Sequence, residues 1–335
     1  MCRYGDRVIS RRHVVLALGS SALAPRIVAA QIASKMYRVG WLSKAAPATD
    51  ASPFGAALIR SLDKYGYTLG RNLAFERRGA DFHVERLPLL IDELVASKVD
   101  VILASGYQPA VAAKVGATIP VVVFSSGDPV GTGLVESLAR PGGHLTGIAD
   151  TMVELSPKRL QLLKEMVPGL RRVAVIWNVG DAGMTLRYQA SEESARKLGI
   201  TVEAYGVREL KDFEAAFAAM KGSKPDAIFI VSDSLTVGHR RYVLDFASAN
   251  RLPAIFEEPP SVVRDGSLMF YGPDLDEICG RIAYLVDRIL KGAKPADLPF
   301  EQPRSFRLVV NAKTAKALGL TIPATLLVRA DEVIE

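Results

Sequence analysis

The chain has 335 residues, of which 49% are hydrophobic and 23% charged, and a formal net charge of +6. This length and composition exclude a disordered chain and a small disulfide-stapled domain, and they suffice for two large hydrophobic cores. The positive charge does not indicate nucleic-acid binding, because no Lys/Arg-rich run with interleaved aromatic residues follows the first 30 residues.

Those first 30 residues are typical of an export signal peptide. Four arginines precede an apolar run, Val14 to Leu23, that is too short to span a bilayer, and Val28-Ala29-Ala30 offers small residues for cleavage. Ser10-Arg11-Arg12 also resembles a twin-arginine leader, so both export routes stay open. We therefore expect a periplasmic mature chain that begins near Gln31. Its net charge is +2, because five arginines and one aspartate leave with the leader.

From Tyr37 onward, short apolar runs alternate with longer amphipathic stretches. In the first half this pattern predicts strands at 37–42, 72–77, 99–105, 119–125 and 145–150, and helices at 54–65, 84–97 and 109–115. In the second half it predicts strands at 172–178, 201–207, 226–232 and 252–256, and helices at 184–198, 211–220 and 237–250. Strand-helix alternation favours parallel sheets with helices on both faces. The predicted fold class is therefore α/β, with two Rossmann-like lobes and a cleft between them.

Polar side chains follow the predicted strands at the ends where ligands bind in open α/β sheets. In the first half these residues are Ser43, Ser105, Ser125, Ser126 and Asp128, and in the second half Asn178, Asp181, Ser232, Asp233, Ser234, Glu257 and Glu258. Such residues also cap helix N-termini, and both roles stay open. A helix N-terminus presents free N–H groups and a positive dipole end, so this geometry favours a carboxylate ligand.

The sequence lacks the residue patterns that common enzyme active sites and metal sites require. His13, His83, His144 and His239 are scattered singly, without the spacing of a metal site, and no P-loop, GxSxG or GxGxxG motif follows a strand. Cys279 stands alone after leader removal and is expected to be a buried, inert thiol. We expect no catalytic residue, no metal and no cofactor.

Four long segments resemble one known family. Residues 125–150, 156–178, 266–277 and 289–335 are similar to the tryptophan/tyrosine-binding-like group of ABC-transporter substrate-binding proteins, which have the type I periplasmic-binding-protein fold. The resemblance covers essentially the whole mature chain. It departs at His144, where the family usually has Asn, and in the loop 177–188, where the family usually has an Asn-Pro sequence.

The resemblance implies a lobe organisation in which the chain crosses three times between lobes. We expect an N-terminal lobe of residues 36–151 plus 267–298 and a C-terminal lobe of residues 152–266 plus 299–335, after the signal peptide of residues 1–30. The segment LVVNAKTAKALGL near the end of the chain could complete either lobe.

The resemblance also implies an amino-acid-type ligand, which needs donors for a carboxylate and an acid for an ammonium. We assign carboxylate contacts to the first lobe, at Ser105, Tyr107, Ser125 and Ser126, and the ammonium to Asp233 and Glu257. The remaining candidates are Ser43, Asp128, Asn178, Ser232 and Tyr271. Trp177 is read either as core or as an aromatic wall, and Tyr271 either as a ligand contact or as a packing residue near the crossing.

The sequence thus predicts an extracytoplasmic solute-binding protein of an ABC importer. It binds a small solute, an aromatic or other amino acid being one candidate, by closure of two lobes, and delivers it to an ABC permease with its ATPase. We expect a monomer without nucleic-acid partners. An exported α/β hydrolase and the ligand-binding component of a sensory system are the alternatives. A DNA-binding regulator is disfavoured, because too little sequence precedes Tyr37 for a helix-turn-helix domain.

Overall fold

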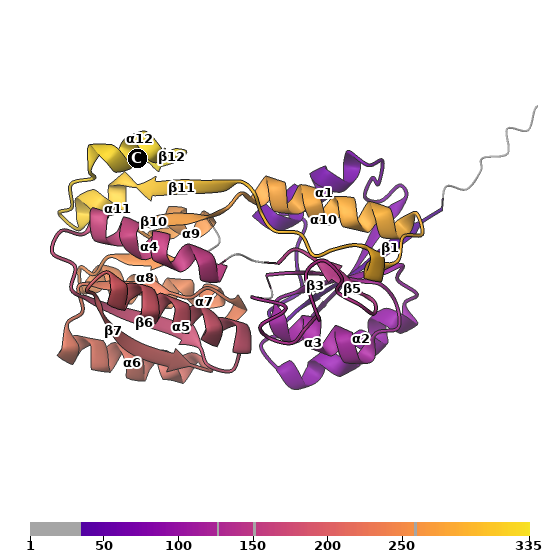
Figure 1. The fold of residues 1–335 in the computed structure, drawn as a ribbon, viewed down its shortest axis with the longest axis horizontal. Helices are drawn as coiled ribbons and strands as arrows, with labels where there is room; N and C mark the ends of the chain where they lie inside the picture. Colours follow the sequence, from indigo (N-terminus) through magenta and orange to yellow (C-terminus); the bar gives the residue numbers. More distant parts are fainter. Residues whose placement is uncertain (1–34, 126, 150–151, 258–259) are drawn as a thin grey trace, which may run out of the picture. The chain divides into compact units, whose positions relative to one another are not determined.

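The computed structural model describes residues 35–335 except 126, 150–151 and 258–259 (Figure 1). Residues 36–335 form one compact unit, which carries all the helices and strands given below. The predicted signal peptide lies outside the described residues, and so do the predicted site residue Ser126 and the loop acid Glu258. Within the described ranges, no helix is both long and apolar enough to cross a membrane.

The first sheet has five parallel strands in the order β2-β1-β3-β4-β5. These are β1 (Tyr37–Ser43), β2 (Leu73–Gly79), β3 (Val101–Ser105), β4 (Val121–Phe124) and β5 (Leu145–Gly147). The helices of this part are α1 (Pro53–Asp63), η1 (Val84–Arg86), α2 (Leu87–Ala96), α3 (Tyr107–Gly116), and, from far along the chain, α10 (Leu275–Leu290).

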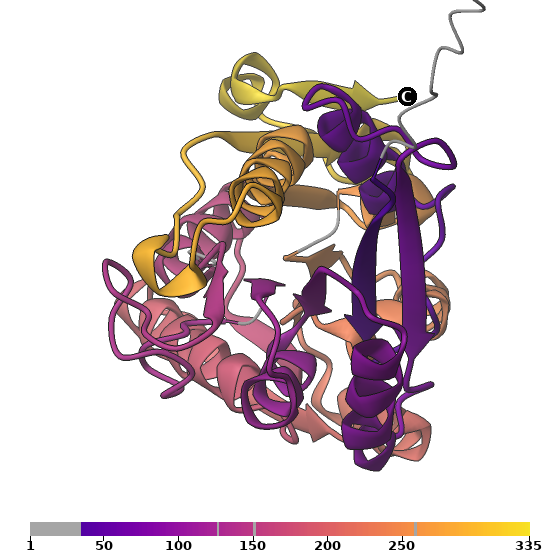
Figure 2. The ribbon, with the colours of Figure 1, turned by 90° about the vertical axis from the view of Figure 1, so that its right-hand side faces the viewer.

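Both faces of this sheet are covered, as continuous apolar strands require. Val101 and Leu103 of β3 pack with α1 and α10, whereas Ile102 and Ala104 of the same strand pack with α2 and α3. Figures 1 and 2 show α10 beside α1, on the other side of the strands from α2 and α3. The period-2 alternation of a strand thus divides one buried run between two cores.

Cys279 of α10 belongs to the core shared by α1 and α10 and is 0% exposed. Its Sγ donates to the carbonyl oxygen of Phe54 at 3.8 Å, and burial raises the pKa of the thiol to about 12. In a chain that carries Cys2→Ser, we expect 5,5′-dithiobis(2-nitrobenzoic acid) to titrate no thiol in the native state and one after unfolding, because the thiolate is the reactive form. Fast native labelling would contradict this packing.

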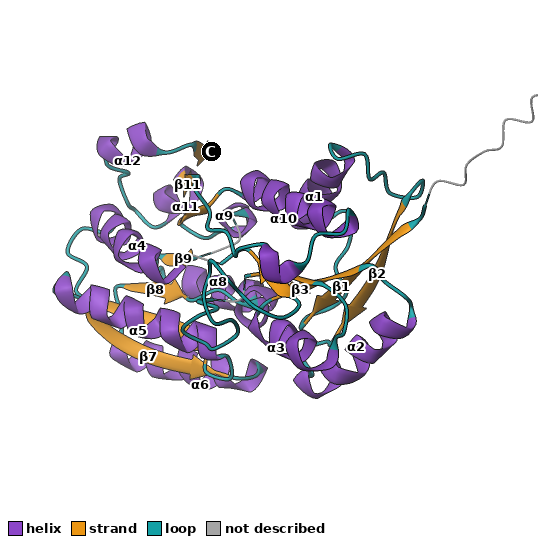
Figure 3. Cartoon of the chain, turned by 45° about the vertical axis from the view of Figure 1, so that its right-hand side comes forward, coloured by secondary structure: helices purple, strands orange, loops and turns teal. Residues whose placement is uncertain are grey.

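The second parallel sheet has the order β7-β6-β8-β9. Its strands are β6 (Arg172–Asn178), β7 (Thr201–Val207), β8 (Ala227–Ile230) and β9 (Ala254–Phe256). Helices α4 (Met152–Met166) and α5 (Ala182–Lys197) contribute to the core on one face, and α6 (Leu210–Ser223) and α8 (Arg240–Ala249) to the core on the other. Figure 3 shows how these helices flank the strands.

The predicted helix 237–250 is two helices, α7 (Ser234–Gly238) and α8, which meet at His239. The ring of Phe82, from the loop after β2, packs where a side chain on Gly238 would be, because a Cβ there would lie 2.7 Å from Phe82 Cζ. This close approach is a long-range contact, so the local pattern could not predict it.

A third, small sheet contains β10 (Met269–Pro273), β11 (Phe306–Asn311) and β12 (Glu332–Ile334). The β10–β11 pair is antiparallel and the β11–β12 pair is parallel. The short elements around it are α9 (Ser261–Asp265), η2 (Pro295–Asp297), α11 (Ala312–Ala317) and α12 (Ala324–Arg329). The sequence pattern predicted the two parallel sheets but not this mixed one.

The segment after Gly266 contributes to hydrophobic clusters on both parallel sheets. Leu268 and Met269 pack with Leu308 and Val310 in the cluster that also contains α4 and α5, whereas α10 packs on the first sheet. Residues 267–298, which we assigned to the N-terminal lobe, therefore contribute to clusters on both parallel sheets. The lobe boundaries as a whole stay a prediction.

Candidate functional site

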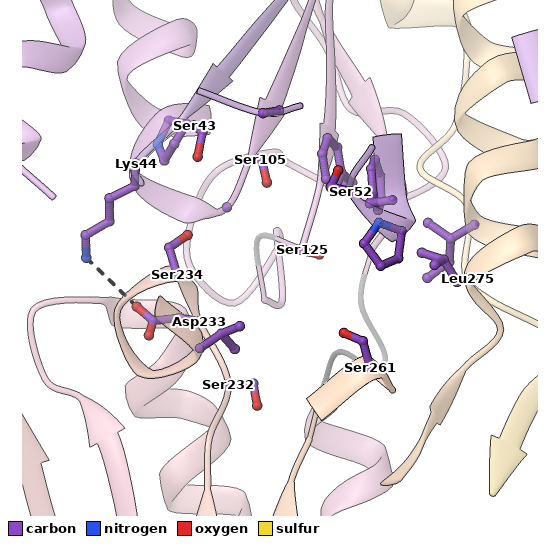
Figure 4. A pocket seen from close by; sticks show the side chains of 18 of the residues that line it. Ser43, Lys44, Ser52, Ser105, Ser125, Ser232, Asp233, Ser234, Ser261 and Leu275 are labelled. Carbon is purple, nitrogen blue, oxygen red and sulfur yellow. Dashed lines mark ion pairs between the residues drawn. The ribbon is translucent and has the colours of Figure 1, made fainter. Parts of the chain in front are cut away.

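A cavity of about 350 Å³ is lined by loops at the carboxyl ends of both parallel sheets (Figure 4). Ser43 ends β1, Ser105 ends β3 and Ser125 follows β4, whereas Ser232 and Asp233 follow β8. The carboxyl ends of parallel strands are the usual place for ligands in open α/β sheets. These loops lie at the strand ends where the sequence predicts the ligand site.

One end of the cavity is apolar and largely aromatic. Phe54 and Phe124 are stacked with ring centroids 4.6 Å apart, and Trp41 lies against them at 5.6 Å and 6.3 Å. Leu275 and Ile278 of α10 line the same cavity, and Figure 4 shows Leu275 on the side away from Lys44. Such a surface suits an apolar or aromatic ligand group, since burying one stabilises a complex by about 1.5–3 kcal/mol.

Phe54 takes its place from the start of α1. The Ser52 hydroxyl accepts a hydrogen bond from Gly55 N at 3.0 Å, and Pro53 occupies the first turn, where its missing N–H costs nothing. Both residues also line the cavity. Helix capping and cavity lining therefore coincide here.

The opposite end of the cavity is charged. Lys44 Nζ lies 3.9 Å from Asp233 Oδ2, and the two side chains are only 8% and 7% exposed. Asp233 is the N-cap of α7, where its Oδ1 accepts from Thr236 N at 2.9 Å. Asn178 Nδ2 donates to Asp233 Oδ2 at 2.7 Å. The Asp233 carboxylate is thus fixed in orientation, with Asn178 behind it.

Asp181 is the second acid of the cavity and is 3% exposed. Its Oδ1 caps α5 by accepting from Met184 N at 3.2 Å. Burial, and next the negative charge of Asp233, raise the pKa of Asp181 to about 6. Two acids and one lysine therefore share this end, which favours a ligand that carries a positive charge.

The loop after β4 brings Ser125 to the cavity through unusual backbone geometry. Ser125 has φ +54°, in the left-handed region that non-glycine residues rarely adopt. Two residues on, Gly127 packs so closely on α5 that a Cβ there would lie 3.0 Å from the Cα of Gly183. Nearby, Gln108 Nε2 donates to the carbonyl oxygen of Gly180 at 2.9 Å. These contacts join loops of the two parallel sheets beside the cavity.

Five of the eleven predicted site residues line this cavity: Ser43, Ser105, Ser125, Ser232 and Asp233. Tyr107 instead lines a separate hollow of about 380 Å³ between α2 and α3. Asp128 accepts from Val130 N at 2.9 Å and supports its own turn. Asn178 acts behind Asp233, as described above. Ser126 lies outside the described residues.

Glu257, predicted to pair with a ligand ammonium, does not line the cavity and is 0% exposed. Its Oε1 lies 3.1 Å from Arg159 Nη1 and its Oε2 lies 3.3 Å from Arg187 Nη1. Both arginines are themselves buried. Glu257 therefore forms buried ion pairs with arginines of α4 and α5. Its position after an apolar strand gives no sign of these partners in the sequence. The same carboxylate accepts from Ser232 N at 3.4 Å, and in this way supports the segment that does line the cavity.

Two aromatic candidates also lie away from the cavity lining. Tyr271 packs against the core near Phe306, and its carbonyl oxygen accepts from Arg159 Nε at 2.7 Å. Trp177 stacks on Tyr188 with centroids 3.8 Å apart. Each follows the packing alternative considered for it.

Sequence reasoning missed several residues that line the cavity: Trp41, Lys44, Ser52, Phe54, Gln108, Phe124, Leu275 and Ile278. It placed Asp181 in the right loop without choosing it as a site residue. Lys44 follows Ser43 at the end of the first strand, and this position is the only signal in the sequence that could have found it.

The described histidines have other neighbours. His144 Nε2 lies 3.2 Å from the carbonyl oxygen of Ala113, His239 Nδ1 lies 2.9 Å from that of Leu235, and His83 is exposed beside Glu85. In the part of the chain that the structure describes, no group of three or more His, Cys, Asp or Glu side chains could hold a metal ion.

Comparison with known proteins supports the architecture. A curated protein of Clostridioides difficile (strain R20291), called a tyrosine-binding protein, is 27% identical over 276 residues, which cover 82% of this chain and 78% of that protein. A solved conserved domain protein of Vibrio cholerae is 26% identical with a TM-score of 0.82, over 89% of this chain and 100% of the other. A solved ABC domain of Streptococcus pneumonia, in complex with L-Trp, is 23% identical with a TM-score of 0.81, over 90% and 100%.

The two solved structures confirm the predicted α/β fold with parallel sheets. The family model that describes ABC transporter substrate binding proteins matches residues 47–334, which are most of the chain. The match therefore confirms the resemblance that the sequence predicted: the chain belongs to the family of ABC transporter substrate-binding proteins.

Proposed function

We propose that this protein is the extracytoplasmic solute-binding component of an ABC importer, and that its ligand is an amino acid with an apolar or aromatic side chain. The observation that carries the proposal is the division of the cavity into an aromatic end and a charged end. A free amino acid has the same division between its side chain and its zwitterionic head. The two would therefore match along the cavity.

The relatives support this ligand class. The curated relative from Clostridioides difficile is called a tyrosine-binding protein, and the Streptococcus structure contains L-Trp. In this chain, Trp41, Phe54 and Phe124 would contact the ligand side chain, and Asp181 and Asp233 would accept hydrogen bonds from its ammonium. Asp233 keeps the role predicted for it, whereas Asp181 takes the place predicted for Glu257.

Binding would act by closure. Residues from loops of both parallel sheets line the cavity, so a ligand that touches both groups of loops would favour the conformation in which they are close together. A permease with its ATPase would then recognise that conformation. We infer that the protein works as a monomer in the periplasm, to which the leader of residues 1–30 directs it.

Thermal unfolding with a panel of the twenty amino acids tests the proposal. A ligand at one hundred times its dissociation constant adds about 2.7 kcal/mol of stability, which raises the midpoint by several degrees in a chain of this size. We expect aromatic or large apolar amino acids to produce this shift and Asp, Glu and Lys to produce none. A panel without any shift, together with turnover of an ester substrate, would overturn the proposal in favour of a hydrolase.

Leu275→Gln places an amide in the apolar end of the cavity, and Leu89→Gln makes the same change at an exposed position of α2. We expect Leu275→Gln to weaken binding of the best ligand by about tenfold, because a leucine contact worth about 1.5 kcal/mol is replaced by a polar group. Leu89→Gln should leave calorimetric affinity unchanged. Equal affinity of both variants and the wild type would remove this cavity from the proposal.

A further inference from the structure

Lys44 is buried without a matching set of hydrogen-bond acceptors. Its side chain is 8% exposed, and its Nζ makes no hydrogen bond to the described residues. The ion pair that it does form, with Asp233 Oδ2, is 3.9 Å long and exceeds hydrogen-bond distance. An ammonium has three donors, and Lys44 lines the cavity, where a ligand could supply acceptors. The side chain therefore has donors left for a further acceptor.

Asp233 does not supply a hydrogen bond to Lys44, because the two groups are 3.9 Å apart and other contacts fix the orientation of the carboxylate. Its Oδ1 accepts from Thr236 N and its Oδ2 accepts from Asn178 Nδ2. These contacts keep the carboxylate in the N-cap position of α7. Lys44, which follows β1, extends toward Asp233 at the same end of the cavity, and Figure 4 marks the ion pair between them.

We propose that Lys44 binds the α-carboxylate of the ligand and so makes the site selective for amino acids over amines that have the same side chain. This inference rests on the proposed function and deepens it. A zwitterion adds one negative and one positive charge. The ligand carboxylate accepts hydrogen bonds from Lys44. The ligand ammonium donates to Asp181 and to the remaining lone pairs of Asp233.

Lys44 replaces the residues expected from the sequence, which gave the carboxylate to Ser105, Tyr107, Ser125 and Ser126. Ser105 and Ser125 do line the cavity, but a hydroxyl is a neutral donor. A charge-assisted hydrogen bond is roughly twice as strong as a neutral one. Lys44 is therefore the residue whose loss should distinguish ligands with and without a carboxylate.

Matched ligand pairs test this proposal. We would titrate L-tryptophan and tryptamine, L-tyrosine and tyramine, L-phenylalanine and phenethylamine, and L-leucine and isopentylamine, reading weak amines by displacement of the bound amino acid. In the wild type we expect the amino acid to bind about 10- to 100-fold more tightly than its amine. In Lys44→Met this ratio should fall to about one, because amino-acid affinity falls and amine affinity does not. Lys197→Met, at an exposed ion pair with Glu193, should keep the wild-type ratio.

The outcomes distinguish the role of Lys44 from the proposed function. An unchanged ratio in Lys44→Met, or an equal loss for both members of a pair, would overturn the role of Lys44 while leaving amino-acid binding intact. A ratio that collapses in Ser105→Ala instead would return the carboxylate to the serines. If none of the four amino acids binds the wild type, the proposed function fails, and this inference fails with it. Lys44→Gln, which keeps a neutral donor, replaces Lys44→Met if that variant does not fold.

Discussion

Replacement of Glu257 by glutamine is expected to lower the free energy of unfolding by about 3–5 kcal/mol, because it breaks a buried ion pair by removing one partner. Arg159 and Arg187 are buried on either side of this carboxylate, at 3.1 Å and 3.3 Å. Glutamine keeps the shape but leaves two buried guanidinium groups without the charge between them. Urea unfolding followed by circular dichroism measures the loss.

The matched control is Glu193→Gln. Glu193 pairs with Lys197 at 2.7 Å on the surface of α5, where both side chains are more than half exposed. Solvent screens such a pair, and we expect no measurable change. If both substitutions left stability unchanged, the buried network would not hold the second parallel sheet together. The prediction would also fail if Glu257→Gln destabilised no more than the surface control.

The same substitution should reach the cavity indirectly. Glu257 Oε2 accepts from Ser232 N, and Arg187 Nη1 donates to the Ser232 carbonyl oxygen at 3.2 Å. This network therefore anchors the segment that presents Ser232 and Asp233 to the cavity. We predicted direct contact with the ligand for Glu257, but in the structure it supports Ser232, which lines the cavity.

Hydrophobic period predicted the fold because the parallel strands are local in sequence and the inner strands are buried on both faces. Val121 to Phe124 and Ala227 to Ile230 read as strands for this reason alone, and both are central strands. The third sheet escaped prediction because its pairing is not local. Phe270 pairs with Val309, and Val310 with Val333, across connections that no short pattern describes.

For the cavity, sequence predicted where polar loops would lie but not which side chains would turn inward. Ser43 and Ser105 are neighbours because β1 pairs with β3. The predicted alternation of strands and helices implies parallel strands whose carboxyl ends lie at the same edge of the sheet. Lys44 is one residue further, and a lysine in a loop is most often solvated. Phe54 and Leu275 come from α1 and α10, which are far apart in sequence and pack together only in the folded chain. Their contribution depends on tertiary packing.

Replacement of Asp181 by asparagine is expected to stabilise the protein at neutral pH. The pKa of Asp181 is raised from 3.8 to about 6, so the folded state binds its proton more tightly than the unfolded state does. The resulting stability is fully present below about pH 4 and is lost as the pH rises through about 6, and the lost amount is about 3 kcal/mol. Asparagine has no charge to desolvate and still caps α5, since its side-chain oxygen accepts from Met184 N as aspartate does.

Urea unfolding between pH 4 and 7.5 measures the effect. The wild type should lose stability across this interval relative to Asp181→Asn, and the two curves should converge toward pH 4. Asp274→Asn changes another helix N-cap, that of α10, in the same way and controls for the loss of a capping charge. Parallel curves for the wild type and Asp181→Asn would show that Asp181 does not titrate as its environment indicates.

A buried acid that destabilises the fold at neutral pH needs a compensating role, and the proposed ammonium contact supplies one. The ionised form of Asp181 is the form that accepts hydrogen bonds from a ligand ammonium, so wild-type affinity for an amino acid should weaken as the pH falls below about 6. Asp181→Asn should bind weakly at every pH and lose that dependence. Charged residues that lower the stability of the fold are expected at binding sites, where their charge contacts the ligand. A variant that gains stability and keeps wild-type affinity would instead assign the ammonium to Asp233 alone.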